Sequence, residues 1–231
     1  MLARMRRVFP LPEHVDVAIE ALYSRARTPH SDGRPAVELC MISTPDGAIS
    51  VDGRSGPLGN PTDAQVLATL RGACDVVLVG AGTIRAEKYT APSRRGLRIG
   101  VVSRTGNVDT SSSLFSSGSG FLIVPESAQT PPVDHIVCGD SSVDFNEALR
   151  LLASQFGARF VHVEGGPQIN AELMAVDCVD AINLTIAPWI SGGMGEGIAT
   201  NSVPRNFALE HLCVDGDHVF ARYVRATAPQ V

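Results

Sequence analysis

The chain has 231 residues, of which 44% are apolar, and a formal net charge of −5 at pH 7. A chain of this length can bury one large core, so we expect one main domain. The acidic balance argues against non-specific binding of nucleic acid or of an anionic membrane, because such proteins need a cationic surface. An anionic ligand would therefore have to be held by a few local cations and backbone N–H groups.

The cysteines and the N-terminal segment bear on the cellular compartment. The five cysteines are widely separated and form no C-x-x-C pair, so neither a disulfide framework nor a metal site is expected. Pro10 and Pro12 interrupt the region where a signal peptide needs an unbroken apolar stretch. No run approaches the roughly 18 apolar residues of a membrane span. The expected location is the cytoplasm, without membrane attachment.

Apolar residues at helical spacing predict an amphipathic N-terminal helix over about 13–26, and a polar stretch then looks like a linker. Residues 1–33 are therefore expected to form an N-terminal helix and linker. Residues 34–231 are expected to form the main domain.

Within that domain the pattern repeats strand, turn and helix. Asn60-Pro61 and Asp144 followed by Glu147 are typical helix starts, and Asp215-Gly216 between two strand-like runs predicts a hairpin. The predicted fold is α/β, a mostly parallel sheet with helices on both faces and a C-terminal antiparallel hairpin. Strands are predicted over 36–43, 75–80, 99–103, 121–124, 135–138, 160–164, 181–187, 206–214 and 218–224, helices over 61–72, 145–156 and 167–174, and a flexible loop over 111–120.

Two glycine-rich segments follow predicted strands, where an α/β sheet presents its ligand site. In Gly80-Ala81-Gly82-Thr83 the glycines allow close approach of a phosphate, and the hydroxyl can donate to it. The alternative interpretation is an ordinary turn between strand and helix.

The second segment is Gly165-Gly166 before Pro167, which opens a helix. A pyrophosphate at that helix N-terminus would gain about 0.3–1 kcal/mol from the dipole. Two such loops from different strands favour a nucleotide cofactor more than either loop alone.

Ser103 ends another predicted strand, and Arg104 follows it. A hydroxyl beside a guanidinium suits the 2′-phosphate that distinguishes NADPH from NADH. The alternative is a solvated surface arginine. The chain has no G-x-G-x-x-G, so the usual Rossmann fingerprint is absent.

Two carboxylates are candidates for the substrate side. Asp46 precedes a glycine, which usually indicates a turn, and it becomes interesting only if the fold brings it to one pocket with Glu164. Reduction of an imine-like carbon requires a proton for the neighbouring nitrogen. A carboxyl with a raised pKa can bind a heterocycle and supply that proton.

Taken in order, these motifs resemble the reductase domain of the bifunctional riboflavin-biosynthesis deaminase/reductase, which is similar in fold to dihydrofolate reductase. The resemblance covers about residues 34–224. It is carried by Arg34-Pro35-x-Val37 through Met41, Asp46-Gly47, Arg71 to Asp75, Val79 to Thr83, Val163 to Pro167, and Ile186 to Pro188 followed by Gly192-Gly193.

The resemblance implies an NADPH-dependent reductase acting on a pyrimidine- or pteridine-type heterocycle, and a homodimer paired through sheet edges at the C-terminal hairpin. Asp46 and Glu164 would line the substrate side beside the nicotinamide. Ser103 and Arg104 would select the 2′-phosphate. The cofactor's phosphates would be held by Gly80, Gly82, Thr83, Gly165, Gly166 and Pro167.

Two departures from the family pattern leave the substrate open. Residues 1–33 are too short for the zinc deaminase domain that often precedes this reductase, and Cys40 lies where the family tends to place a lysine. The leading hypothesis is reduction of 5-amino-6-(5-phosphoribosylamino)uracil or a close relative. The alternatives are a dihydrofolate-reducing activity and a non-catalytic NADPH-binding protein.

Overall fold

The computed structural model describes residues 4–10, 16–129, 132–193 and 195–226. Its strands are β1 Arg4–Phe9, β2 Asp16–Ala18, β3 Ala36–Ser43, β4 Val76–Gly80, β5 Arg98–Val102, β6 Gly120–Val124, β7 His135–Val137, β8 Phe160–Val163, β9 Ala181–Ile186, β10 Phe207–Asp215 and β11 His218–Arg225. Its helices are α1 Ile19–Tyr23, α2 Pro61–Ala73, α3 Ala81–Glu87, α4 Ser113–Ser116, α5 Phe145–Phe156 and α6 Pro167–Ala175, with a 3₁₀ turn over Gly56–Leu58.

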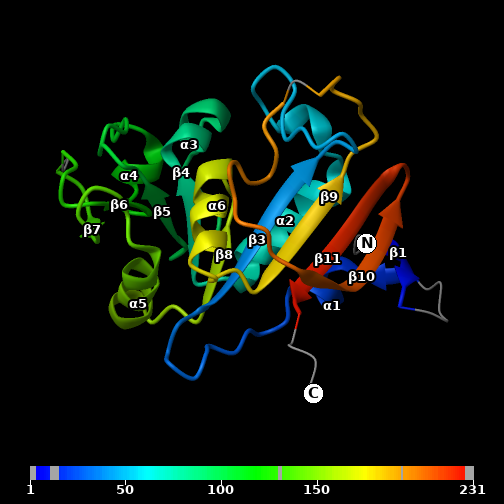
Figure 1. The fold of residues 1–231 in the computed structure, drawn as a ribbon, viewed down its shortest axis with the longest axis horizontal. Helices are drawn as coiled ribbons and strands as arrows, with labels where there is room; N and C mark the ends of the chain where they lie inside the picture. The colour runs from blue at the N-terminus through cyan, green and yellow to red at the C-terminus, as the bar shows by residue number, and fades with distance from the viewer. Residues whose placement is uncertain (1–3, 11–15, 130–131, 194, 227–231) are drawn as a thin grey trace.

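The described strands form one eleven-stranded sheet in the order β2-β1-β10-β11-β9-β3-β8-β4-β5-β6-β7 (Figure 1). Every neighbouring pair from β9 to β7 is parallel, and every pair from β2 to β9 is antiparallel. Central strands such as β4 and β8 are entirely buried, as expected for apolar strands covered on both faces. The predicted fold class is therefore confirmed.

Helices cover the two faces of the parallel part (Figure 1). Helices α5 and α6 pack on one face, and α2, α3 and α4 pack on the other, while α1 joins the second cluster beside the antiparallel strands, so the core has two layers. The predicted caps are present. Asn60 accepts a hydrogen bond from the Asp63 N–H, Asp144 accepts from two N–H groups, and Gly157 ends α5 with a left-handed φ of 63°.

The N-terminal prediction is largely wrong. In place of a long helix, β1 and β2 form an antiparallel pair, and among the described residues of this region the helix is the short α1. Part of the predicted range, residues 13–15, lies outside the described residues. Of the apolar residues that predicted the helix, Ile19, Leu22 and Tyr23 do lie in α1 and are buried in the core. The residues just before them, Asp16–Ala18, form β2, so the helix begins later than expected.

The hairpin is present, but its edge is not open. Strand β1 pairs with β10, so the sheet continues past the hairpin to β2. The expectation that the hairpin provides a free edge for dimer pairing is therefore wrong, because backbone groups of β10 are already bonded within the chain.

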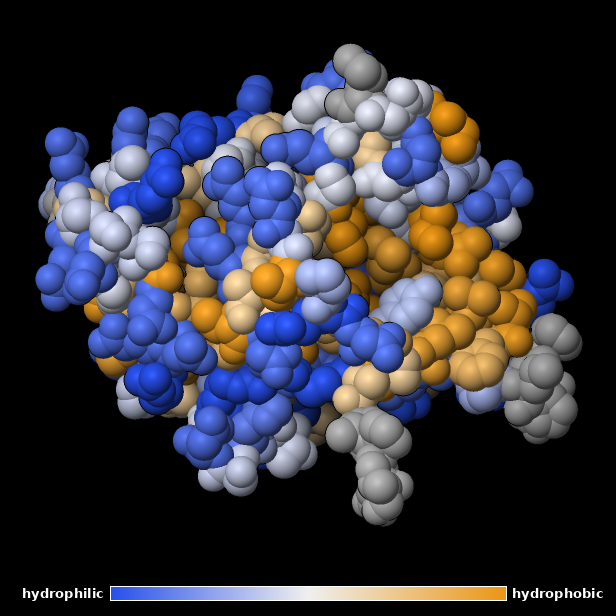
Figure 2. Space-filling view, in the orientation of Figure 1, coloured by the Kyte–Doolittle hydropathy of each residue, from blue (hydrophilic) through white to orange (hydrophobic). Residues whose placement is uncertain are grey.

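One face of the antiparallel part carries no helix in the view of Figure 1, and Figure 2 shows a hydrophobic area there. Pairing places alternate residues of β9, β10 and β11 on this face. We call it the apolar sheet face; its half-buried members are Leu184, Ile186, Leu212, Val214, Val219 and Tyr223.

The segment predicted as a flexible loop, residues 111–120, contains the short helix α4. Its Leu114 and Phe115 are buried against the sheet, which the surrounding serines and glycines concealed in the sequence. None of the helices in the described parts of the chain is long and apolar enough to cross a membrane.

Candidate active site

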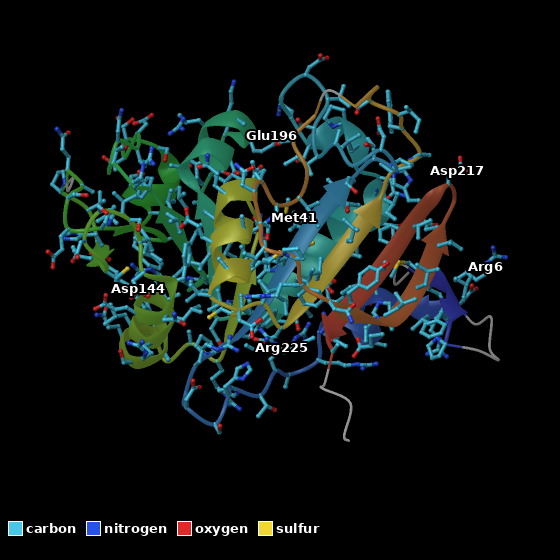
Figure 3. The ribbon with its side chains drawn as sticks, viewed as in Figure 1. Arg6, Met41, Asp144, Glu196, Asp217 and Arg225 are labelled. Carbon is cyan, nitrogen blue, oxygen red and sulfur yellow. The ribbon has the colours of Figure 1, made fainter. Side chains whose placement is uncertain are left out.

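A cleft of about 690 Å³ opens at the carboxyl ends of β3, β4, β5 and β8. In an α/β sheet this is the edge where ligands bind. Figure 3 labels two of its lining residues, Met41 on β3 and Glu196 in the segment between β9 and β10. The cleft is therefore bordered by the parallel strands and by the long connection that follows β9.

The two glycine segments predicted from the sequence meet in this cleft. The Gly80 N–H donates to the Gly165 carbonyl at 2.8 Å. A Cβ on Gly80 would lie 3.2 Å from the Gly166 nitrogen, and one on Gly166 would lie 3.3 Å from the Thr83 hydroxyl oxygen. A side chain at either position would force its neighbour to shift by a few tenths of an ångström, and at Gly80 that neighbour is backbone. Gly80, Gly82, Thr83, Gly166 and Pro167 line the cleft, whereas Gly165 is not among the lining residues and is bonded to Gly80.

Helix α6 points its N-terminus into the cleft. Gly166 is its N-cap residue, no side chain caps the helix end, and Pro167 occupies the first turn. The first N–H groups of a helix have no intrahelical partner and form its positive end. Gln168 and Ile169 of this turn line the cleft, so the structure presents uncapped N–H donors where an anion would lie.

Ser103 and Arg104 also line the cleft, at its β5 end. The Ser103 hydroxyl oxygen accepts a hydrogen bond from the Gly106 N–H at 3.1 Å, so the side chain also shapes the turn. Arg104 is exposed, and no described carboxylate lies within salt-bridge distance of it. Its guanidinium is thus available to a ligand.

Glu164 lines the cleft as expected, but it is tightly paired. Both of its oxygens accept hydrogen bonds from Arg71 at 2.6 Å, and Tyr89 donates to Oε2 at 2.5 Å. Burial would raise the pKa of this carboxyl, but the hydrogen bonds from Arg71, helped by the His162 ring 3.3 Å away, outweigh burial and hold the pKa well below its usual range. The expectation of a raised pKa at Glu164 is therefore wrong.

The structure does not bring Asp46 into the cleft. Its exposed carboxylate accepts hydrogen bonds from Thr44 and from the backbone N–H groups of Ser191, Gly192 and Gly193. These hydrogen bonds hold the pKa of Asp46 well below its usual range. The bond from Thr44 has the largest effect, and those from the 191–193 loop add to it. The turn interpretation describes Asp46 better than the prediction that it shares a pocket with Glu164.

Asp63 is a cleft carboxylate that sequence reasoning did not select. It lies in the first turn of α2, where an acidic residue is explained by the helix dipole, and it lines the cleft with Cys40. Burial raises the pKa of Asp63, and a hydrogen bond with Thr185 only partly opposes this. Burial also raises the pKa of the Cys40 thiol, so Cys40 contributes no charge.

Arg71 and Tyr89 were also missed as site residues. Arg71 lies near the end of α2 and stacks over the Tyr89 ring, 5.4 Å from its centroid. A carboxylate at the end of a buried strand requires a cationic partner. The sequence could therefore have predicted that an arginine such as Arg71 pairs with Glu164. Nothing local in the sequence marks Tyr89.

Comparison with known proteins places this architecture in a family. The model of the RibD C-terminal domain family matches residues 35–220. The chain belongs to this family. The match confirms the resemblance to riboflavin-biosynthesis reductases.

Three similar proteins illustrate the range of the RibD C-terminal domain family. The 2,5-diamino-6-ribosylamino-4(3H)-pyrimidinone 5′-phosphate reductase of Methanothermobacter thermautotrophicus is 28% identical over 212 residues, covering 82% of this chain and 98% of the relative. A pyrimidine reductase-like protein of Corynebacterium diphtheriae superposes with a TM-score of 0.79 at 25% identity, covering 92% of this chain and 100% of that one.

The third is a deaminase/reductase of Thermotoga maritima, which matches with a TM-score of 0.68 at 24% identity over 85% of this chain and supports the fold. This chain spans 58% of its length. The relatives of matching length are thus named as reductases or as reductase-like proteins, and the longer one combines two activities.

Proposed function

We propose that this chain is an NADPH-dependent reductase of a pyrimidine-type heterocycle, with 5-amino-6-(5-phosphoribosylamino)uracil or its 2,5-diamino counterpart as the leading substrate. The observation that carries the proposal is the contact between the two glycine segments beside the uncapped end of α6. This feature provides backbone donors and open space for a pyrophosphate at the edge of a sheet.

The residues at this edge fit a nicotinamide dinucleotide. A Cβ on Gly82 would meet no atom within 4 Å, so the backbone there is open to the cleft. In the proposed site Gly80, Gly82 and Thr83 bind the phosphates from one side. Gly165, Gly166 and Pro167, together with the start of α6, bind them from the other side. Ser103 and Arg104 bind the 2′-phosphate.

The bound dinucleotide supplies the hydride, and the chain must position the heterocycle and manage a proton. Asp63 suits the first task because its pKa is raised by burial. The protonated carboxyl can donate a hydrogen bond to a ring nitrogen, and the carboxylate can accept one from a ring N–H. Tyr89 carries an exchangeable proton into the cleft, and burial raises its pKa well above the usual value, so its hydroxyl stays protonated. In this proposal Glu164 orients Tyr89 and does not act as an acid.

Asp46 has a different proposed role from the one first expected. Its carboxylate holds the 191–193 loop by accepting from the backbone N–H groups. The same connection between β9 and β10 contributes Glu196 to the cleft. We therefore assign Asp46 to shaping the rim of the cleft, outside direct contact with the heterocycle.

A substrate without a phosphate, such as dihydrofolate, is the second candidate. Two groups at the heterocycle end of the cleft support this candidate: the uncharged thiol of Cys40 and the carboxylate of Asp63. Neither group favours binding of a substrate phosphate there. Arg71, the cation nearest to these residues along α2, is already paired with Glu164.

The test follows NADPH oxidation by the purified protein with the ribosylaminouracil phosphate, its diamino counterpart and dihydrofolate at matched concentrations. Turnover of either pyrimidine supports the leading substrate, and turnover of dihydrofolate alone supports the second. Tight NADPH binding with no turnover would favour a non-catalytic binding protein. Failure to bind any nicotinamide dinucleotide would refute the proposed function.

The proposed assembly is a homodimer formed through the apolar sheet face. Edge pairing at the hairpin is closed off by β1, whereas this face offers half-buried apolar side chains on three neighbouring strands. A second copy supplies an identical apolar surface, as a two-fold dimer requires. Replacing Leu184 and Val219 with lysine should convert the dimer to a monomer in sedimentation. A wild-type chain that sediments as a monomer at micromolar concentration would refute the assembly.

A further inference from the structure

The far end of the cleft from Cys40 contains a carboxylate that the proposed function leaves unused. Glu172 lies on α6, four residues after Gln168, and both side chains line the cleft. Residues four apart occupy one face of a helix, so α6 turns this face towards the ligand space. The same end of the cleft is lined by Ser103 and Arg104, which follow β5.

Glu172 lies close enough to Arg104 for the positive charge of the guanidinium to act on its carboxyl group. Partial burial raises the pKa of Glu172, and the nearby Arg104 guanidinium partly opposes that rise. No hydrogen bond to the Glu172 carboxylate and no salt bridge occurs among the described residues, so the side chain is not anchored elsewhere on the protein.

These two residues act in opposite directions on a 2′-phosphate. Such a phosphate carries a charge of about −1.5 to −2, so it is attracted by Arg104 and repelled by a neighbouring carboxylate. The ribose of NADH has hydroxyls in the same place, and a carboxylate accepts hydrogen bonds from them. A cleft end that holds one cation and one anion therefore discriminates weakly between the two cofactors.

We propose that Glu172 is a cofactor-selectivity residue, which weakens binding of the 2′-phosphate so that the protein accepts NADH alongside NADPH. This inference rests on the proposed function, since it assumes that the adenosine end of a nicotinamide dinucleotide lies beside Ser103 and Arg104. Arg85 is the other cation that lines the cleft. It projects from α3, which follows Gly80, and therefore lies on the side assigned to the pyrophosphate.

The experiment uses the full chain and two probes that contain only the adenosine end, adenosine 2′,5′-bisphosphate and adenosine 5′-monophosphate. Isothermal titration calorimetry gives the affinity ratio of the two probes for the wild type and for Glu172→Gln. Glu196→Gln is the matched control, because it removes the same charge from the cleft at the connection after β9. Thermal melting of each variant checks that it is folded.

In Glu172→Gln the preference for the bisphosphate should rise roughly five- to tenfold, the effect of removing one unit charge near a phosphate at a partly hydrated site. The Glu196→Gln ratio should match the wild type. A ratio unchanged in Glu172→Gln, with both probes still bound, would overturn this inference and leave the proposed function intact. If neither probe nor NADPH binds the wild type, both proposals fail.

Discussion

Replacing Arg71 with methionine tests the structure of the site directly, because it leaves the carboxylate of Glu164 buried without its cation. The Glu164 side chain is 4% exposed, and Arg71 supplies two of its hydrogen bonds. Removing one partner of a buried ion pair costs about 3–5 kcal/mol. Because the Arg71 side chain is 31% exposed and water screens it, we expect the lower end, about 3 kcal/mol.

A loss of that size should be visible in calorimetric melting at pH 7. For a domain of 150–250 residues each kcal/mol shifts Tm by about 2–4 °C, so the expected fall is about 6–12 °C. Asp134→Asn is the control, because it breaks the 2.9 Å pair with Arg98 but Asp134 is 71% exposed. An exposed pair of this kind should cost less than about 1 kcal/mol.

The pH dependence provides a second check on Arg71→Met. The depressed pKa of Glu164 contributes stability above the unfolded value of 4.5, and that contribution is lost as pH falls. Without Arg71 the pKa rises and the contribution is absent, so the deficit relative to wild type should shrink as pH falls below 4.5. A melting temperature within about 2 °C of wild type at pH 7 would refute this account of Glu164.

Three further outcomes are expected. Asp63→Asn should lower turnover by about 10²–10⁴ while the Kd for NADPH stays unchanged; unchanged turnover would remove Asp63 from the proposed mechanism. Arg104→Ala should weaken NADPH far more than NADH in a binding titration, and equal weakening would mean that it does not contact the 2′-phosphate. Burial raises the pKa of Glu38, but hydrogen bonds from Arg222 and Arg27 prevail and lower the pKa from 4.5 to about 2. This pairing stabilises the fold by about 3 kcal/mol above pH 4.5, and the contribution is lost as pH falls towards 2. In urea titrations Glu38→Gln should therefore have a lower free energy of unfolding than wild type at pH 7. On acidification its free energy of unfolding should fall by less than that of wild type.

The parallel part of the fold was predictable because its signals are local. Five-residue apolar runs such as β4 are typical of strands buried on both faces, and Asn60 and Asp144 marked helix starts that the structure confirms. The two glycine segments were recognised for a similar reason, since each follows a strand. Their direct contact was not predictable, because it depends on β4 and β8 being neighbours in the sheet.

The roles of the carboxylates depended on partners distant in the sequence. Asp46 was assigned to the substrate, yet its partners are the N–H groups of a loop about 145 residues later. Glu164 was expected to hold a proton, yet Arg71 fixes it as an anion from 93 residues away. Asp63 was overlooked because one acidic residue in a first helical turn already has an explanation.

The first strand also affects how the protein should be divided for expression. Met5, Ile19 and Leu22 share a buried cluster with Val66 and Phe220, and β1 covers the outer backbone of β10. A fragment starting at residue 35, where the family match begins, would expose both that cluster and a nine-residue strand edge to solvent. Such a fragment is a candidate for aggregation through unpaired strands, even though it retains every residue assigned to the cleft.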